Sequence, residues 1–131
     1  MASARKSLPP KKKLVLVVED DASVRELVAK ALGTKYTVLT APDGMAASEL
    51  LGSTDAPDLL ICDVMMPKVD GFSFVRSIKA DPKFANMDVI FLTAKGGAPA
   101  LVQGIQLGAR HFISKPFNVK DLVDKVAKLL A

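Results

Sequence analysis

The chain has 131 residues, of which 50% are hydrophobic and 24% are charged, and its formal net charge is +4. This length and hydrophobic content predict one globular domain with a buried core. No apolar run reaches the roughly eighteen residues that a transmembrane helix needs, and the basic start lacks the apolar stretch of a secretory signal. We therefore expect a cytoplasmic protein, and the single cysteine, Cys62, excludes an internal disulfide.

The positive charge is concentrated at the N-terminus. Residues 1–13 hold five of the 18 basic residues and no acidic one, so the rest of the chain carries 13 basic against 14 acidic residues. Because the body of the chain is not basic, we expect neither nucleic acid nor a membrane as a partner. The Ser, Pro and Lys content predicts a disordered tail over residues 1–12 and a folded domain over residues 13–131, with a nucleic-acid or membrane contact of the tail as the alternative.

Apolar, β-branched runs alternate with segments of helical spacing along the body of the chain. The expected strands are 14–18, 36–41, 58–62, 88–92 and 110–113. The expected helices run from 21 or 22 to about 32, from 43 or 44 to about 51, from 72 to about 80, from about 99 to 107, and from 119 to 130. Asp21 and Asn118 precede two of these helices and are candidate N-caps. The alternation predicts an α/β fold with a doubly wound parallel sheet and right-handed crossovers.

Acidic, hydroxyl and amino side chains follow the ends of four of the expected strands. Glu19 and Asp20 follow the first strand, Asp63 the third and Thr93 the fourth, and Lys115 follows the fifth. Ligands bind beyond the carboxyl ends of strands in such sheets, so these side chains are expected in one crevice. Three neighbouring carboxylates repel one another, which favours a protonated acid or a hard cation among them.

The chemistry of this crevice suits a cation and a phosphoryl group. Mg²⁺ prefers oxygen ligands and is usually held by one or two carboxylates together with phosphate oxygens. Lys115 and Thr93 can contact the phosphoryl oxygens, and a carboxylate can itself be the nucleophile. Asp63 is the best candidate for that nucleophile, because it is a single acid at the end of a buried strand.

Four segments, in this order, resemble the receiver domains of two-component response regulators, the CheY-like family. They are LVLVVEDDASVREL, LLICDVMMPKVDGFSF, FLTAK and HFISKPF, and the resemblance covers residues 13–131. It implies a flavodoxin-like (βα)5 fold with five parallel strands in the order 2-1-3-4-5. It also implies a phosphorylation-switched signalling module of a phosphorelay.

The resemblance assigns the acidic residues their roles. Asp63 is the implied phosphoacceptor, forming an aspartyl phosphate. Glu19, Asp20, Asp63 and the backbone carbonyl of Met65 are the implied ligands of the cofactor, Mg²⁺ or Mn²⁺. The first acid is Glu19 where the family more often has Asp, which lengthens the arm and keeps the carboxylate.

The resemblance also implies a switch. Lys115 would contact the phosphoryl group, and the Lys115–Pro116 peptide bond would be cis. Thr93 would move toward the phosphoryl oxygens, and Phe112 would turn inward to fill the space that Thr93 leaves. The surface formed by residues 99–107, 110–113 and 119–130 would change with them.

The implied partners are a sensor histidine kinase or histidine phosphotransfer protein and a downstream protein target. The chain is expected to be a monomer or a phosphorylation-dependent homodimer. It is not expected to be a conventional turnover enzyme, but to catalyse its own phosphotransfer and a slow hydrolysis of the aspartyl phosphate. The resemblance implies that Met65 and Lys95, two residues beyond Asp63 and Thr93, occupy positions that influence how readily water attacks the acyl phosphate. An apolar Met beside a cationic Lys is poorly suited to orient that water, so slow hydrolysis is expected.

Three alternatives stay open. The last expected helix ends with the chain, which favours a single-domain response regulator, but the chain could be a receiver fragment of a larger response regulator or hybrid kinase. A phosphate-independent interaction module would be expected to lack Asp63, Thr93 or Lys115. A Mg²⁺-dependent phosphohydrolase with an Asp nucleophile commonly needs a second acid where this chain has Met65.

Overall fold

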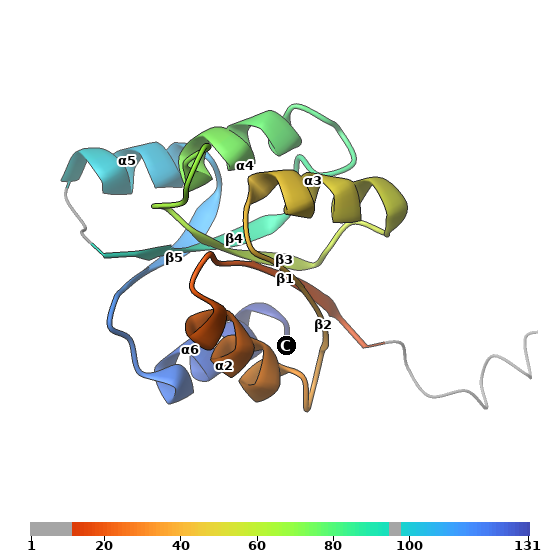
Figure 1. Cartoon of the computed structure of the whole chain (residues 1–131), viewed down its shortest axis with the longest axis vertical. Coiled ribbons are helices and arrows are strands. Elements are labelled where there is room, and N and C mark those ends of the chain that lie inside the picture. The colour runs from red at the N-terminus through yellow and green to blue at the C-terminus, as the bar shows by residue number, and fades with distance from the viewer. Residues whose placement is uncertain (1–11, 95–97) are drawn as a thin grey trace, which may run out of the picture.

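The structure, a computed structural model, describes residues 12–94 and 98–131 (Figure 1). The strands are β1 (Leu14–Val18), β2 (Thr37–Ala41), β3 (Leu59–Asp63), β4 (Asp88–Thr93) and β5 (Ala109–Ser114). The helices are α2 (Ala22–Leu32), α3 (Gly44–Ser53), α4 (Gly71–Lys79), α5 (Ala98–Gln106) and α6 (Val119–Leu129). The tail prediction, apart from Lys12, and the role expected of Lys95 lie outside the described residues. Among the helices that are described, none has the length and apolar character to cross a membrane.

The five strands form one parallel sheet in the order β2-β1-β3-β4-β5. This confirms the predicted fold class and strand order. Since all strands point the same way, their carboxyl ends meet at one edge of the sheet, and β1 and β3 lie side by side at its centre.

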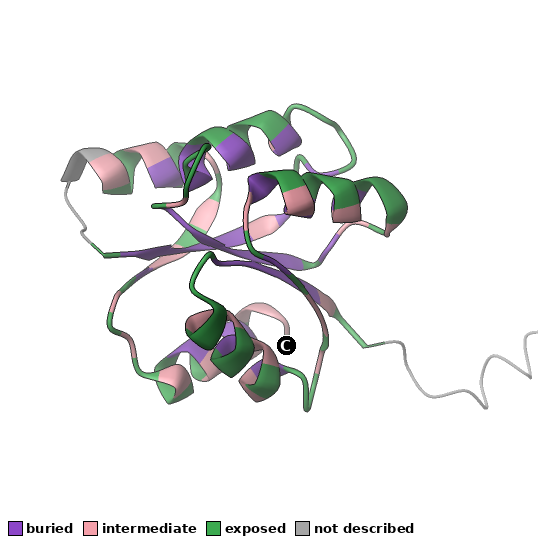
Figure 2. Cartoon of the chain, viewed as in Figure 1, coloured by how far each residue is buried: buried purple, intermediate pink, exposed green. Residues whose placement is uncertain are grey.

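Helices cover both faces of the sheet, with α2 and α6 on one face and α3, α4 and α5 on the other (Figure 1). Successive residues of β1 point to opposite faces, so Leu16 and Val18 join one apolar cluster while Val15 and Val17 join the other. Both clusters are buried, as the purple sheet between green outer helix faces shows in Figure 2. This arrangement explains why the central strands are apolar without alternation.

Side-chain caps fix the starts of four helices. Asp21 and Asn118 cap α2 and α6, as predicted, and Asp43 and Asp70 cap α3 and α4. In each case a side-chain oxygen accepts a hydrogen bond from a backbone N–H of the first turn, which satisfies one of the helix's unpaired donors. Each cap residue directly precedes its helix, so it also fixes where the preceding loop ends.

The predicted boundaries were wrong by one or two residues at several elements. Asp63 and Thr93 are the last residues of β3 and β4, whereas the sequence had suggested that they follow those strands. Helix α4 begins at Gly71 because the cap at Asp70 and a hydrogen bond of 2.8 Å from Gly71 N to Val64 O fold the loop back. A Cβ on Gly71 would lie 2.2 Å from the Asp63 carbonyl oxygen, so only glycine permits this close return.

Candidate functional site

The central strands bring three carboxylates together at the carboxyl edge of the sheet. Glu19 directly follows β1, and Asp63 ends the neighbouring strand β3. One carboxylate oxygen from each of Glu19, Asp20 and Asp63 lies within 4.8 Å of the others. Glu19 and Asp63 are buried and Asp20 is exposed, so the cluster opens to solvent on the side of Asp20.

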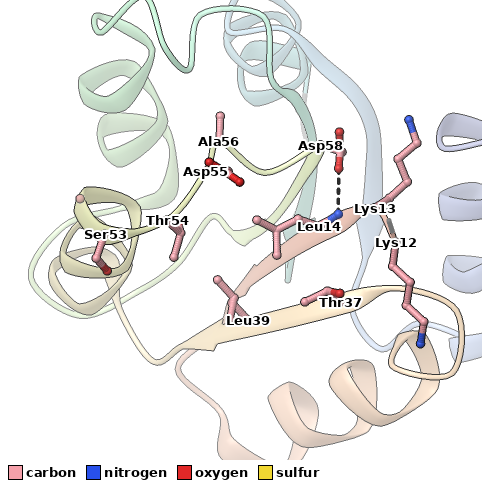
Figure 3. A pocket seen from close by; sticks show the side chains of 11 residues that line it. Lys12, Lys13, Leu14, Thr37, Leu39, Ser53, Thr54, Asp55, Ala56 and Asp58 are labelled. Carbon is pink, nitrogen blue, oxygen red and sulfur yellow. Dashed lines mark hydrogen bonds between the residues drawn. The ribbon is translucent and has the colours of Figure 1, made fainter. Parts of the chain in front are cut away.

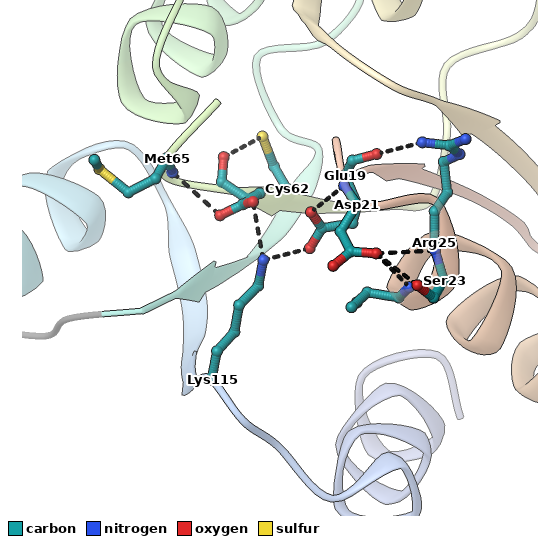
Figure 4. Close-up of polar contacts among 9 residues, drawn as sticks. Glu19, Asp21, Ser23, Arg25, Cys62, Met65 and Lys115 are labelled. Carbon is teal, nitrogen blue, oxygen red and sulfur yellow. Dashed lines mark hydrogen bonds and ion pairs between the residues drawn. The ribbon is translucent and has the colours of Figure 1, made fainter. Parts of the chain in front are cut away.

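Lys115 enters this cluster from the segment that follows β5 (Figure 4). Its Nζ lies 2.5 Å from Glu19 Oε1 and 2.9 Å from Asp63 Oδ2. The Lys115 backbone N–H donates to the Thr93 carbonyl oxygen at 2.8 Å, and the Lys115–Pro116 bond is cis, the isomer that the resemblance implies. One ammonium therefore bridges the two buried acids.

Asp63 is held at both carboxylate oxygens. Lys115 Nζ donates to Oδ2 at 2.9 Å, and the Met65 backbone N–H donates to Oδ1 at 3.1 Å. The carboxylate is thus oriented by one charged donor and one backbone donor, although it is almost completely buried. The Met65 side chain is 67% exposed and contributes little to the core.

Burial and charge shift the pKa values of the cluster in different directions. Loss of hydration raises the pKa of Glu19 from 4.5 to about 7. Burial alone would lower the pKa of Lys115, but its hydrogen bonds to Glu19 and Asp63 outweigh this effect and raise it. Burial alone would raise the pKa of Asp20, yet hydrogen bonding with the Glu19 and Asp63 side chains lowers it. Near neutral pH, Asp20 is therefore ionised while Glu19 is close to its midpoint.

This donor set fits a small hard cation. Among the residues that the structure describes, three carboxylates face one ammonium here, so an additional positive charge would relieve their mutual repulsion. All available side-chain ligands are oxygens, which suits Mg²⁺ better than a softer metal. Glu19, Asp20 and Asp63 would hold the ion.

The predicted switch residues lie on the two strands beside the cluster. Thr93 is buried at the end of β4, paired in register with Ser114, and its strand borders β3. Phe112 is half-buried, and its ring centroid lies 5.5 Å from that of Phe91 and 6.4 Å from that of Phe72. The Phe112 ring thus packs inward in this structure.

Two residues near the site carry contacts that sequence reasoning did not find. The Arg25 guanidinium on α2 donates to the Glu19 carbonyl oxygen at 2.8 Å. A Cβ on Gly104 of α5 would lie 1.9 Å from Phe112 Cζ, so the ring fits against α5 only because residue 104 has no side chain. Both contacts depend on how a helix lies against the sheet, and periodicity alone contains no signal for that.

A hollow at the opposite edge of the sheet contains none of the predicted site residues. It has a volume of about 920 Å³ and is lined by Lys12, Lys13, Leu14, Thr37, Leu39, Gly52, Ser53, Thr54, Asp55, Ala56 and Asp58 (Figure 3). Leu14 and Thr37 begin β1 and β2, so this hollow is at the amino edge. The candidate site is therefore identified by its chemistry and not by the size of a cavity.

Comparison with known proteins is consistent with this geometry. Residues 15–127 match the family described as the response regulator receiver domain. The response regulator PleD of Caulobacter vibrioides is 40% identical over 116 residues, which cover 88% of this chain and 25% of PleD. Hybrid signal transduction histidine kinase D of Dictyostelium discoideum is 34% identical over 119 residues, which cover 91% of this chain and 8% of the kinase. The chain thus spans a quarter or less of these two relatives.

Solved structures of similar length share the fold. Chemotaxis protein CheY4 of Vibrio cholerae superimposes with a TM-score of 0.84 at 30% sequence identity, covering 91% of this chain and 99% of CheY4. The non-phosphorylated HemR receiver domain of Leptospira biflexa gives a TM-score of 0.82 at 33% identity, covering 92% of this chain and 95% of that domain.

Proposed function

This chain belongs to the response regulator receiver domain family, and from that premise we propose that it is a phosphorylation-switched signalling module with Asp63 as its phosphoacceptor. The observation that carries the proposal is the Asp63 carboxylate, buried at the end of a central strand with Lys115 Nζ 2.9 Å away. Glu19 and Asp20 stand beside it, so a nucleophile, a cationic partner and a cation site occupy one crevice.

The proposed reaction transfers a phosphoryl group from a histidine of the donor protein. A carboxylate oxygen of Asp63 attacks phosphorus, an O–P bond forms, and the N–P bond to the imidazole breaks, leaving the electron pair on nitrogen. Lys115 Nζ lies between Glu19 and Asp63, so it can contact the phosphoryl oxygens during the transfer and offset their negative charge. Mg²⁺, when held by the three acids, would offset the charge further.

The phosphodonor is proposed to dock beside Lys115. A hollow of about 280 Å³ is lined there by Val24, Leu27, Lys115, Pro116 and Phe117. Leu27 is 52% exposed and adds apolar surface to this hollow beside the charged site. A helix of a histidine kinase or phosphotransfer protein with an apolar side chain on its surface fits this hollow. Such a donor would place the chain in the cytoplasm.

The output surface is proposed to be the face of α5, β5 and α6. On α5, Leu101, Val102 and Ile105 are 46%, 53% and 58% exposed. Phosphorylation would draw Thr93 toward the phosphoryl group and bias the packing of Phe112 beneath α5. A downstream protein, or a second copy of the chain, would then bind this face more tightly.

Hydrolysis of the aspartyl phosphate is proposed to be slow. Met65 is exposed next to Asp63, and its thioether accepts hydrogen bonds only weakly, so it cannot orient an attacking water well. Replacing Met65 with Asn should shorten the half-life of the phosphorylated protein several-fold, measured by loss of the mass adduct after removal of the donor. An unchanged half-life would contradict this part of the proposal.

The test of the whole proposal is the intact mass after incubation with acetyl phosphate, with and without Mg²⁺. Wild type and Asp58→Ala, which changes an exposed acid before β3, should each gain one phosphoryl adduct only with Mg²⁺. Asp63→Ala should gain none. A folded wild type that binds Mg²⁺ but gains no adduct would support the phosphate-independent interaction module instead.

A further inference from the structure

Arg25 reaches from the first turn of α2 back to the end of β1. Its Nη1 donates to the Glu19 carbonyl oxygen at 2.8 Å (Figure 4). Glu19 has no exposed surface, so this carbonyl cannot be satisfied by water and requires a donor from the protein. Arg25 supplies that donor from a half-buried position.

The other polar groups of Glu19 have partners other than Arg25. Its backbone N–H donates to the Ala41 carbonyl oxygen at 3.1 Å, and its Oε2 accepts from the Asp21 N–H at 3.0 Å. Its Oε1 lies 2.5 Å from Lys115 Nζ. The carbonyl that Arg25 holds is different, because it belongs to the peptide group that joins Glu19 to Asp20.

The orientation of this peptide group determines where Asp20 points. Asp20 is the exposed member of the acidic cluster and is outside β1, so the sheet's hydrogen bonds do not fix its backbone. If the Glu19 carbonyl lost its donor, the peptide plane would rotate to bring the oxygen toward water. That rotation would carry the Asp20 carboxylate away from Glu19 and Asp63.

We propose that Arg25 is a positioning residue for the cation site, holding the Glu19–Asp20 peptide so that the Asp20 carboxylate faces the other two acids. The inference rests on the proposed use of this cluster to bind Mg²⁺. It concerns the backbone of the acidic pair, and Arg25 itself does not contact the cation or the phosphoryl group.

An effect of the Arg25 charge and a positioning role for Arg25 predict opposite changes in the affinity for Mg²⁺, so the sign of the change distinguishes them. A guanidinium near a cation site repels the cation, so removing the charge alone would tighten Mg²⁺ binding. Removing a positioning contact would weaken it, as loss of groups that orient metal ligands generally does. The direction of the change in Kd therefore separates the two roles.

The experiment is a calorimetric titration of Mg²⁺ into wild type, Arg25→Met, Arg25→Lys and Lys30→Met. Lys30→Met is the matched control, because it removes an exposed positive charge from the same helix. We expect the Kd of Arg25→Met to rise about tenfold. Arg25→Lys keeps the charge, but its side chain is shorter and its ammonium reaches less far toward the Glu19 carbonyl, so it should also bind more weakly; Lys30→Met should bind like wild type.

A second readout does not involve the cation. In ¹H–¹⁵N spectra of the metal-free protein, Arg25→Met should shift the amide resonances of Asp20 and Asp21, while Lys30→Met should not. Unchanged or tighter Mg²⁺ binding by folded Arg25→Met would overturn the inference and leave the proposed function intact. Failure of the wild type to bind Mg²⁺ would overturn both. If Arg25→Met does not fold, the Kd of Arg25→Lys for Mg²⁺ is compared with the values of wild type and Lys30→Met, and the same outcomes support or overturn the inference.

Discussion

The two edges of the sheet carry similar residue types in different surroundings. At the carboxyl edge, Glu19 and Asp63 are buried around Lys115. At the amino edge, Asp58 is exposed and accepts a hydrogen bond of 2.8 Å from the Leu14 N–H, while Lys12 and Lys13 border an open hollow. Charges interact weakly where water screens them and strongly where it is excluded. Burial, and not residue type, therefore distinguishes the carboxyl edge from the amino edge.

The largest effect should come from removing the buried ammonium. Without divalent cations at pH 8, Lys115→Met should lower the free energy of unfolding by about 3 kcal/mol, because it leaves two buried acids without their cationic partner. The control is Arg110→Met, which breaks an exposed pair with Asp88 at 3.5 Å and should cost less than about 1 kcal/mol. Urea denaturation followed by circular dichroism measures both.

The cost of Lys115→Met should depend on pH with a defined sign. Because the pKa of Glu19 is raised from 4.5 to about 7, the folded protein binds a proton there more readily than the unfolded chain. The folded state therefore loses stability from ionisation of Glu19 as the pH rises from about 4.5 to 7. At pH 5 Glu19 is protonated and needs no cationic partner, so the loss should be smaller than at pH 8. Equal losses at both pH values would show that Glu19 is not the group that Lys115 stabilises.

A second comparison concerns space rather than charge. Gly104→Ala places a Cβ 1.9 Å from Phe112 Cζ, so the ring or α5 must move, and the free energy of unfolding should fall by about 2 kcal/mol. Gly52, which borders the amino-edge hollow, has no atom within 4 Å of an added Cβ. Gly52→Ala should therefore be neutral or stabilising by about 0.5 kcal/mol, since alanine favours the helix. Similar destabilisation by both changes would show that the Phe112 ring does not need Gly104.

The smallest effect is the response to Mg²⁺. At ten times its Kd, Mg²⁺ should raise the free energy of unfolding of the wild type by about 1.4 kcal/mol through linkage. Asp20→Asn should reduce this gain, because it removes one of the three clustered carboxylates. Asp58→Asn, at the amino edge of the sheet, should show the same gain in the free energy of unfolding as wild type. A cation effect that is equal in all three proteins would place the ion elsewhere.

Much of this protein could be predicted from the sequence because the signals are local. The valine-rich runs, the caps at Asp21 and Asn118 and the regular alternation predicted the fold class, and four motifs identified the family. Parallel strands place their carboxyl ends at one edge, so residues at strand ends had to meet there. The acidic cluster of Glu19, Asp20 and Asp63 follows from that rule.

The contacts that depend on how one element lies against another could be found only in the folded protein. The sequence predicted Lys115 in the same crevice as the acids, but not that its Nζ would pair with both Glu19 and Asp63. Arg25 reaches the Glu19 carbonyl because α2 packs close to β1, and Gly104 faces Phe112 because α5 lies over β5. Such contacts join residues through the packing of whole helices and strands. Their geometry depends on how side-chain volumes fill the core, and residue type and periodicity do not reveal it, even for Arg25, which is only six residues from Glu19.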